Sequence, residues 1–146
     1  DTITDFGQSG DQDSLLFGAT PSSSYTRRTI QNDAAANGST YNISTDNTLP
    51  SIFNFTTNTN SYNSAGAVAT LLSGFKVTTD GSTAISGAES FFMILGDGTN
   101  SSVYVWEDTG NGVVSGSELS HMANLTGVDN DTLSGVEFSF QTISGV

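Results

Sequence analysis

The residues of this 146-residue sequence best suited to chemistry gather in one acidic, glycine-rich segment, EDTGNGVVSGSE, which runs from Glu107 to Glu118. Calcium loops of the helix–loop–helix type place oxygen ligands at positions 1, 3, 5, 7, 9 and 12, with glycine at position 6. On that template the ligands are Glu107, Thr109, Asn111, the Val113 carbonyl, Ser115 and Glu118. Asp108 takes over as first ligand if the backbone shifts slightly. The segment therefore predicts a Ca²⁺ site, with a glycine-rich hairpin turn before a capped helix as the alternative.

A second group of carboxylates lies near the start of the sequence, where small and apolar residues surround Asp1, Asp5, Asp11 and Asp13. Carboxylates this close in sequence repel one another unless a cation lies between them. We expect Asp5, Asp11 and Asp13 to form a second calcium cluster. The alternative is a solvated loop that precedes a strand.

The overall charge limits the partners of the protein. Fifteen acidic side chains against three basic ones give a net charge of -12 and a pI near 4.1. Binding to a nucleic-acid backbone needs several Lys or Arg contacts, and an anionic membrane surface would repel such a chain. No apolar run approaches the roughly 20 residues of a membrane span. We therefore predict no nucleic-acid partner and no membrane insertion, with Ca²⁺ as the one expected cofactor.

The composition is typical of secreted proteins. Cysteine is absent, and only 12% of the residues are charged, compared with about 25% in ordinary globular domains. Because the sequence opens at Asp1 with neither an initiator Met nor a signal peptide, we expect a processed chain or a piece of a longer one. The predicted location is extracellular or at the cell surface.

Residues that could support catalysis are few. His121 is the single histidine, and no serine lies in a G-x-S-x-G nucleophile elbow. Glu107 and Glu118 could be placed as a glycosidase pair, but two glutamates alone are weak evidence. We predict that the protein is not an enzyme. Trp106 and Tyr104 fit either a sugar-stacking platform or a buried strand.

The sequence predicts that mainly strands position the candidate ligands. Runs rich in β-branched and aromatic residues, bounded by Gly, Asn, Asp and Ser, predict strands over 14–17, 25–30, 51–57, 75–79, 90–95, 101–106 and 135–142. Capping residues and apolar spacing predict short helices over 64–74 and 117–125. The region 33–64 is expected to carry long loops around one strand. We predict one mainly-β domain over residues 1–146, similar to a β-sandwich, with two short helices.

Two stretches resemble a known family. The opening D-T-I-T-D-F and G-D-Q-D-S-L are similar to the end of calcium-binding RTX (repeats-in-toxin) arrays. From Phe91 to Phe138, and above all in the Y-V-W-E-D-T-G-N-G segment and the following E-L, A, L and G-V, the sequence resembles the carboxy-terminal region of the same proteins. The RTX nonapeptide repeats are absent, and residues 18–83 match no such pattern. The resemblance implies type I secretion and folding on external calcium.

Three hypotheses follow for function. The first is a secreted, calcium-binding structural protein that assembles with itself as a subunit of a fibre, sheath or surface layer. The second is the carboxy-terminal secretion and folding module of a larger RTX adhesin or enzyme. The third is a carbohydrate-binding module for cell-surface glycans, with Trp106 and its aromatic neighbours as the contact surface.

Overall fold

The computed structural model describes residues 2–3, 15–17, 26–33, 40–43, 48–85, 87, 89–133 and 138–140. The strands are β1 (Thr2–Ile3), β2 (Leu15–Phe17), β3 (Thr26–Asp33), β4 (Thr40–Asn42), β5 (Thr48–Phe55), β6 (Lys76–Thr78), β7 (Glu89–Gly96), β8 (Ser101–Asp108), β9 (Leu119–Leu125) and β10 (Phe138–Phe140). The helices are α1 (Ala65–Leu71) and the 3-10 turns η1 (Gly116–Glu118) and η2 (Asn130–Thr132). The predicted mainly-β fold is confirmed.

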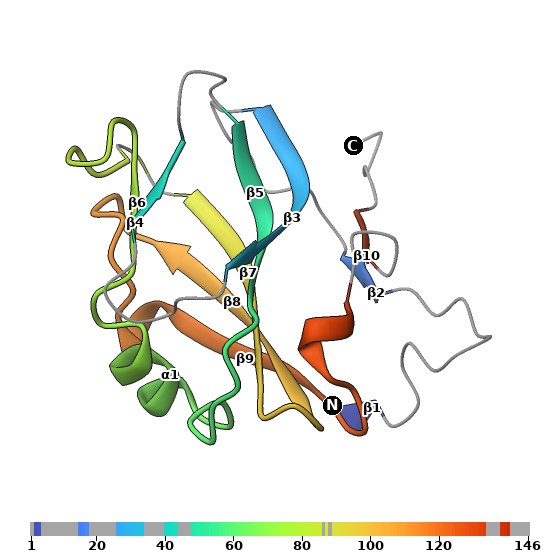
Figure 1. Ribbon diagram of the computed structural model, residues 1–146. Coiled ribbons are helices and arrows are strands. Elements are labelled where there is room, and N and C mark those ends of the chain that lie inside the picture. The colour runs from blue at the N-terminus through green and yellow to red at the C-terminus, as the bar shows by residue number, and fades with distance from the viewer. Residues whose placement is uncertain are drawn as a thin grey trace, which may run out of the picture.

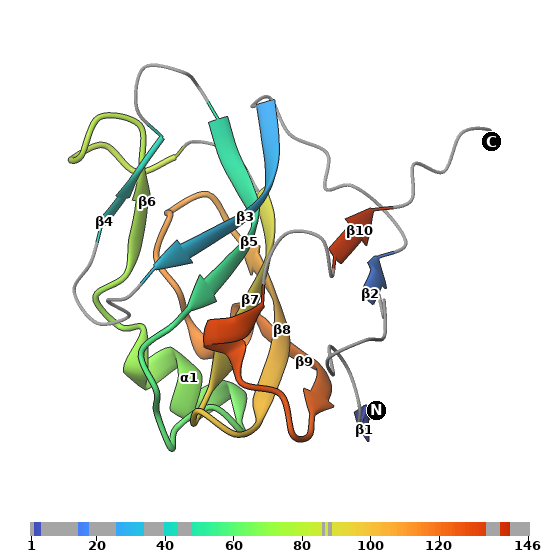
Figure 2. The ribbon, with the colours of Figure 1, turned by 45° about the vertical axis from the view of Figure 1, so that its right-hand side comes forward.

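A six-stranded mixed sheet in the order β1-β9-β8-β7-β5-β3 forms the centre of the fold. Strands β7, β8 and β9 pair antiparallel as consecutive neighbours, whereas β3–β5, β5–β7 and β1–β9 pair parallel. Two smaller parallel pairs, β4–β6 and β2–β10, are the remaining strand pairs among the described residues. Figures 1 and 2 show α1 and the β4–β6 pair on one side of the large sheet and the β2–β10 pair on the other.

The larger hydrophobic core lies on the face of the sheet that α1 and β6 cover. Phe53, Phe55, Phe91 and Trp106 point from the central strands into this core, and Phe75 packs edge-on against Phe53 and Phe55. Each aromatic pair of this kind adds about 0.5–1.5 kcal/mol beyond its buried area. Aromatic side chains of three predicted strands therefore meet in this core.

A smaller core covers the opposite face, so the central strands are buried on both sides. It consists of Ile52, Ile94, Val103, Leu125, Val128 and Leu133. A sheet with one solvent face would bury only alternate residues of 52–55, but all four are buried because residues 128–133 cover the second face.

A buried amide pair fastens η2 to β5. Asn54 Nδ2 donates to the Asn130 carbonyl at 2.8 Å, and Asn130 Nδ2 donates to Asn54 Oδ1 at 3.2 Å and to the Phe55 carbonyl at 2.7 Å. Gly96 lies beside them, and a Cβ there would be 2.5 Å from Asn130 Oδ1. Glycine is therefore needed at position 96 for this close approach.

The helix predicted over 64–74 is present in shorter form. Ser64 is the N-cap, and its hydroxyl accepts a hydrogen bond from the N–H of Ala67 at 3.3 Å. The helix ends at Leu71, and residues 72–74 continue as a turn. Val68 and Leu72 pack into the larger core. In the part of the chain that is described, no helix is long and apolar enough to cross a membrane.

The helix predicted over 117–125 is wrong. Residues 116–118 form a 3-10 turn, and 119–125 form strand β9, which pairs with β8. The prediction rested on Leu119, Met122 and Leu125 at helical spacing. In the structure a register shift skips Met122, which is 48% exposed, so the buried side chains are Leu119, Ala123 and Leu125. One extra residue in a bulge changes the spacing of core positions along a strand.

Candidate metal site

The predicted calcium loop connects β8 to η1 and is closed by the carboxylate of Glu118. Oε1 of Glu118 accepts hydrogen bonds from the Thr109 hydroxyl at 2.6 Å and the Thr109 N–H at 3.1 Å. Oε2 accepts from the Ser115 hydroxyl at 2.9 Å, the Ser115 N–H at 3.2 Å and Trp106 Nε1 at 3.4 Å. Both oxygens are thus engaged by the protein. Glu118 holds the two ends of the loop together.

The environment of Glu118 favours its charged form. Its side chain is 8% exposed, and this burial alone would raise the pKa of the carboxyl group. The hydrogen bonds from Thr109, Ser115 and Trp106 together outweigh burial, and the pKa lies below its usual value of 4.5. Glu118 therefore carries a buried negative charge at neutral pH.

Only one carboxylate oxygen of Asp108 accepts hydrogen bonds from described residues. Its Oδ1 accepts from the N–H of Gly112 at 2.9 Å and of Asn111 at 3.2 Å, whereas Oδ2 is buried and has no hydrogen-bond partner among the described residues. Burial raises the pKa of the Asp108 carboxyl group above its usual 3.8, and the charge of Glu118 adds to the rise. The N–H groups of the loop oppose that rise without cancelling it. Oδ2 thus lacks the partner that a buried charge requires.

Gly112 allows the loop to fold around Asp108. It has a φ of +64°, and a Cβ on it would lie 2.5 Å from the Val77 carbonyl oxygen. Its own carbonyl accepts a hydrogen bond from the Val77 N–H at 2.9 Å. A side chain here would be strained and would separate the loop from β6. Gly112 stands at the turn position of the template, as the sequence indicated.

Glu89 is a buried carboxylate that the sequence did not reveal. It lies directly opposite Asp108 in the β7–β8 register and is 5% exposed, compared with 2% for Asp108. The strand prediction began one residue later, at Ser90, and only the register places Glu89 beside the loop. Two buried acidic residues therefore face each other across the ends of two strands.

The other predicted ligands are spread around the loop. Glu107 is exposed, since neighbouring residues of a strand point to opposite faces and Asp108 points inward. Asn111 is exposed and its side-chain oxygen accepts from the Val113 N–H at 2.8 Å. Val113 forms an isolated antiparallel bridge with Lys76. The structure thus brings Asp108, Thr109, Ser115 and Glu118 together and leaves Glu107 and the Asn111 side chain at the surface.

The second predicted cluster, Asp5, Asp11 and Asp13, lies outside the described residues. Within the described ranges, no three His, Cys, Asp or Glu side chains converge in a group that could hold a metal ion. A cation at Asp108 would therefore take most of its ligands from backbone carbonyls, hydroxyls or water, all of which Ca²⁺ accepts.

The expected sugar platform at Trp106 is not at the surface. The Trp106 side chain is 0% exposed and stacks on Phe91 with ring centroids 5.0 Å apart. The alternative reading of Trp106 as a core residue is the correct one. His121 is exposed, and its Nε2 lies 3.1 Å from Asn124 Oδ1.

Comparisons with protein-family models, with curated proteins and with solved structures find no match to this chain. The RTX resemblance therefore rests on the sequence motifs alone.

Proposed function

We propose that the protein is a secreted, non-enzymatic structural protein whose β-domain is stabilised by Ca²⁺ bound at Asp108. The observation that carries the proposal is the Asp108 carboxylate, which is buried with Oδ2 unpartnered among the described residues. A buried charge without a partner costs several kcal/mol and demands either a proton or a cation.

Several features favour a cation over a proton as the group that neutralises Asp108 at neutral pH. The charge of Glu118 acts on Asp108, and a proton on Asp108 would leave the Glu118 charge in place. The whole chain has a net charge of -12 and only three Lys or Arg residues. Ca²⁺ is a hard cation that prefers oxygen ligands, and extracellular modules bind it with dissociation constants of about 10⁻⁴–10⁻³ M.

Asp108 Oδ2 would supply the carboxylate ligand, with the glycine- and asparagine-rich loop beside it. The engaged carboxylate of Glu118 would keep the loop in shape and contribute charge. A ligand that binds the folded state and not the unfolded state stabilises the protein by mass action. A secreted chain with such a site would reach full stability only where calcium is plentiful.

The test is thermal unfolding at pH 7.5 with Ca²⁺ or with excess chelator, in the wild type, Asp108→Asn and Glu107→Gln. Calcium at about 100 times its dissociation constant should raise the wild-type Tm by roughly 5–10 °C. Asp108→Asn should abolish the rise, because the amide offers no charge to the cation. Glu107→Gln is the matched control: it also removes one carboxylate from β8, and it should keep the rise.

An equal rise in Asp108→Asn, or no rise in the wild type, would contradict the site. Light scattering during the same titration tests the structural role separately. Growth in particle size is expected if calcium promotes assembly into a fibre or layer. A chain that stays monomeric throughout would rule out calcium-driven assembly while leaving the site intact.

A further inference from the structure

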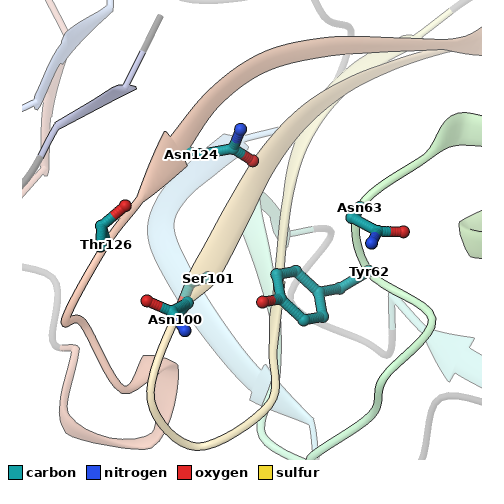
Figure 3. A pocket seen from close by; sticks show the side chains of 6 residues that line it. All are labelled: Tyr62, Asn63, Asn100, Ser101, Asn124 and Thr126. Atoms are coloured by element: carbon teal, nitrogen blue, oxygen red, sulfur yellow. The ribbon is translucent and has the colours of Figure 1, made fainter.

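A second candidate site lies at the opposite end of β8 from the predicted calcium loop. A pocket of about 240 Å³ lies between the segment that leads into α1, the β7–β8 turn and the end of β9. Figure 3 shows the side chains that line it. Its lining residues are Tyr62, Asn63, Asn100, Ser101, Asn124 and Thr126. Three segments distant in sequence thus contribute side chains that are all polar and uncharged, together with one aromatic ring.

Hydrogen bonds fix the aromatic ring of the pocket. The Tyr62 hydroxyl donates to Asp97 Oδ2 at 3.0 Å, and the Tyr62 carbonyl accepts from the buried Tyr104 hydroxyl at 2.9 Å. Asp97 is itself held by the N–H groups of Thr99 and Asn100 at 2.9 and 2.8 Å. The ring therefore needs little ordering when a ligand binds, which favours affinity.

Asn124 is oriented in the same way. Its Oδ1 accepts from the Ser102 hydroxyl at 2.7 Å and lies 3.1 Å from His121 Nε2. Its Nδ2 has no hydrogen-bond partner within the described part of the chain. The side chains of Asn63 and Thr126 likewise make no hydrogen bond to any described residue. The pocket thus presents free amide and hydroxyl groups beside a fixed ring.

We propose that this pocket binds a neutral sugar ring. Amide and hydroxyl groups pair with sugar hydroxyls as both donors and acceptors, and the face of a tyrosine ring packs against the C–H face of a pyranose. No ionised side chain lines the pocket, so it offers no counter-charge to an ionised ligand, and the net charge of -12 disfavours an acidic one. The proposal does not depend on calcium at Asp108.

The volume of the pocket indicates the size of the ligand. A volume of about 240 Å³ lies below the roughly 300–1,000 Å³ of sites for drug-sized molecules. It admits about one ring, so the ligand is a single residue, most simply the terminal residue of a glycan.

The test is a titration of the ¹⁵N-labelled protein with methyl glycosides of glucose, galactose, mannose and N-acetylglucosamine, followed by NMR. Methyl glucuronide serves as the acidic comparison. At least one neutral glycoside should give saturable shifts at the amides of 62–63, 100–101 and 124–127, with a dissociation constant in the millimolar range. A matching oligosaccharide should bind through its terminal residue.

Alanine variants of the lining residues test whether the sugar binds in the pocket. Asn63→Ala and Asn124→Ala should each weaken binding roughly fivefold or more, the expected cost of one good hydrogen bond. Asn60→Ala is the matched control, because Asn60 is exposed on the same segment as Asn63 and does not line the pocket. It should change affinity by less than about twofold. Since Asn63 makes no hydrogen bond to described residues, its variant should fold normally.

Several results would overturn the proposal. These are shifts for none of the neutral glycosides, shifts confined to other parts of the molecule, and binding that survives both Asn63→Ala and Asn124→Ala. Equal binding of the glucuronide would contradict the selection for neutral sugars. Repeating the titration with chelator should give the same affinity, which separates this site from the calcium site.

Discussion

Asp108 and Glu118 are buried carboxylates of one loop whose surroundings shift their pKa values in opposite directions. Glu118 accepts hydrogen bonds on both oxygens, so its charged form is favoured. Burial has the largest effect at Asp108 and raises its pKa, so its charged form is less favoured than that of an exposed carboxyl group. Two residues of the same chemical class thus have different roles, which follow from the number of donors aimed at each.

The pH dependence of stability should reflect both residues. In chelator, the free energy of unfolding should rise as the pH falls through the raised pKa of Asp108 toward 3.8. The contribution of Glu118 is present above 4.5 and is lost as the pH falls through its lowered pKa. A plot of Tm against pH should therefore pass through a maximum in mild acid. Asp108→Asn should remove the rise on the neutral side and leave the acid loss.

Glu118→Gln tests the structural role of the second carboxylate. The amide keeps one acceptor oxygen but places an NH₂ group against the donors of Ser115 and Trp106 or Thr109. We expect a loss of about 1–3 kcal/mol at neutral pH, measured by urea unfolding. A stability equal to the wild type would show that these hydrogen bonds contribute little.

At the scale of elements, β9 shows where sequence periodicity misleads. Leu119, Met122 and Leu125 have the spacing of a helix face, and Ser115 and Glu118 have the spacing of a capping box. The box forms, with the Glu118 carboxylate accepting from the Ser115 N–H, but it begins a single 3-10 turn. Pairing with β8 then makes the following residues a strand, and the bulge at Met122 puts Leu119, Ala123 and Leu125 in the core in place of the helix-face set.

The stability lost on truncating side chains of β9 should follow their burial in the strand and not the helical spacing of the sequence. Leu125→Ala should cost about 2–4 kcal/mol, because its side chain is fully buried in the smaller core. Met122→Ala should change stability by less than about 0.5 kcal/mol, since Met122 is 48% exposed. Urea unfolding of the two variants checks this, and similar losses for both would contradict the register of β9.

Other elements were predictable because their signals are local. The strands β5 and β8, the cap at Ser64 and the turn at Gly112 all follow from residue types close in sequence. The Glu89–Asp108 register, the burial of both sheet faces and the six-residue pocket each depend on segments far apart in the chain. Single-sequence patterns carry no information about such pairings, so these features could not be predicted.

At the scale of the whole molecule, the net charge of -12 acts on every carboxylate at once. Monovalent salt should therefore stabilise the protein without any specific site. Raising NaCl from a few millimolar to about 0.15 M shortens the screening length to about 8 Å and should raise the Tm in chelator. KCl should act equally, and Asp108→Asn should respond like the wild type. A Tm that stays flat or falls would show that self-repulsion is not limiting.

The pairing of β1 with β9 affects how the chain reaches its folded state. Thr2 lies opposite Asn124, so the first strand in sequence joins the sheet beside one of the last. A ribosome or an export channel that delivers the chain from its amino end releases β1 long before β9 has emerged. Closing so long a loop is entropically costly and makes folding slow. The six-stranded sheet can therefore be completed only after nearly the whole domain has been delivered.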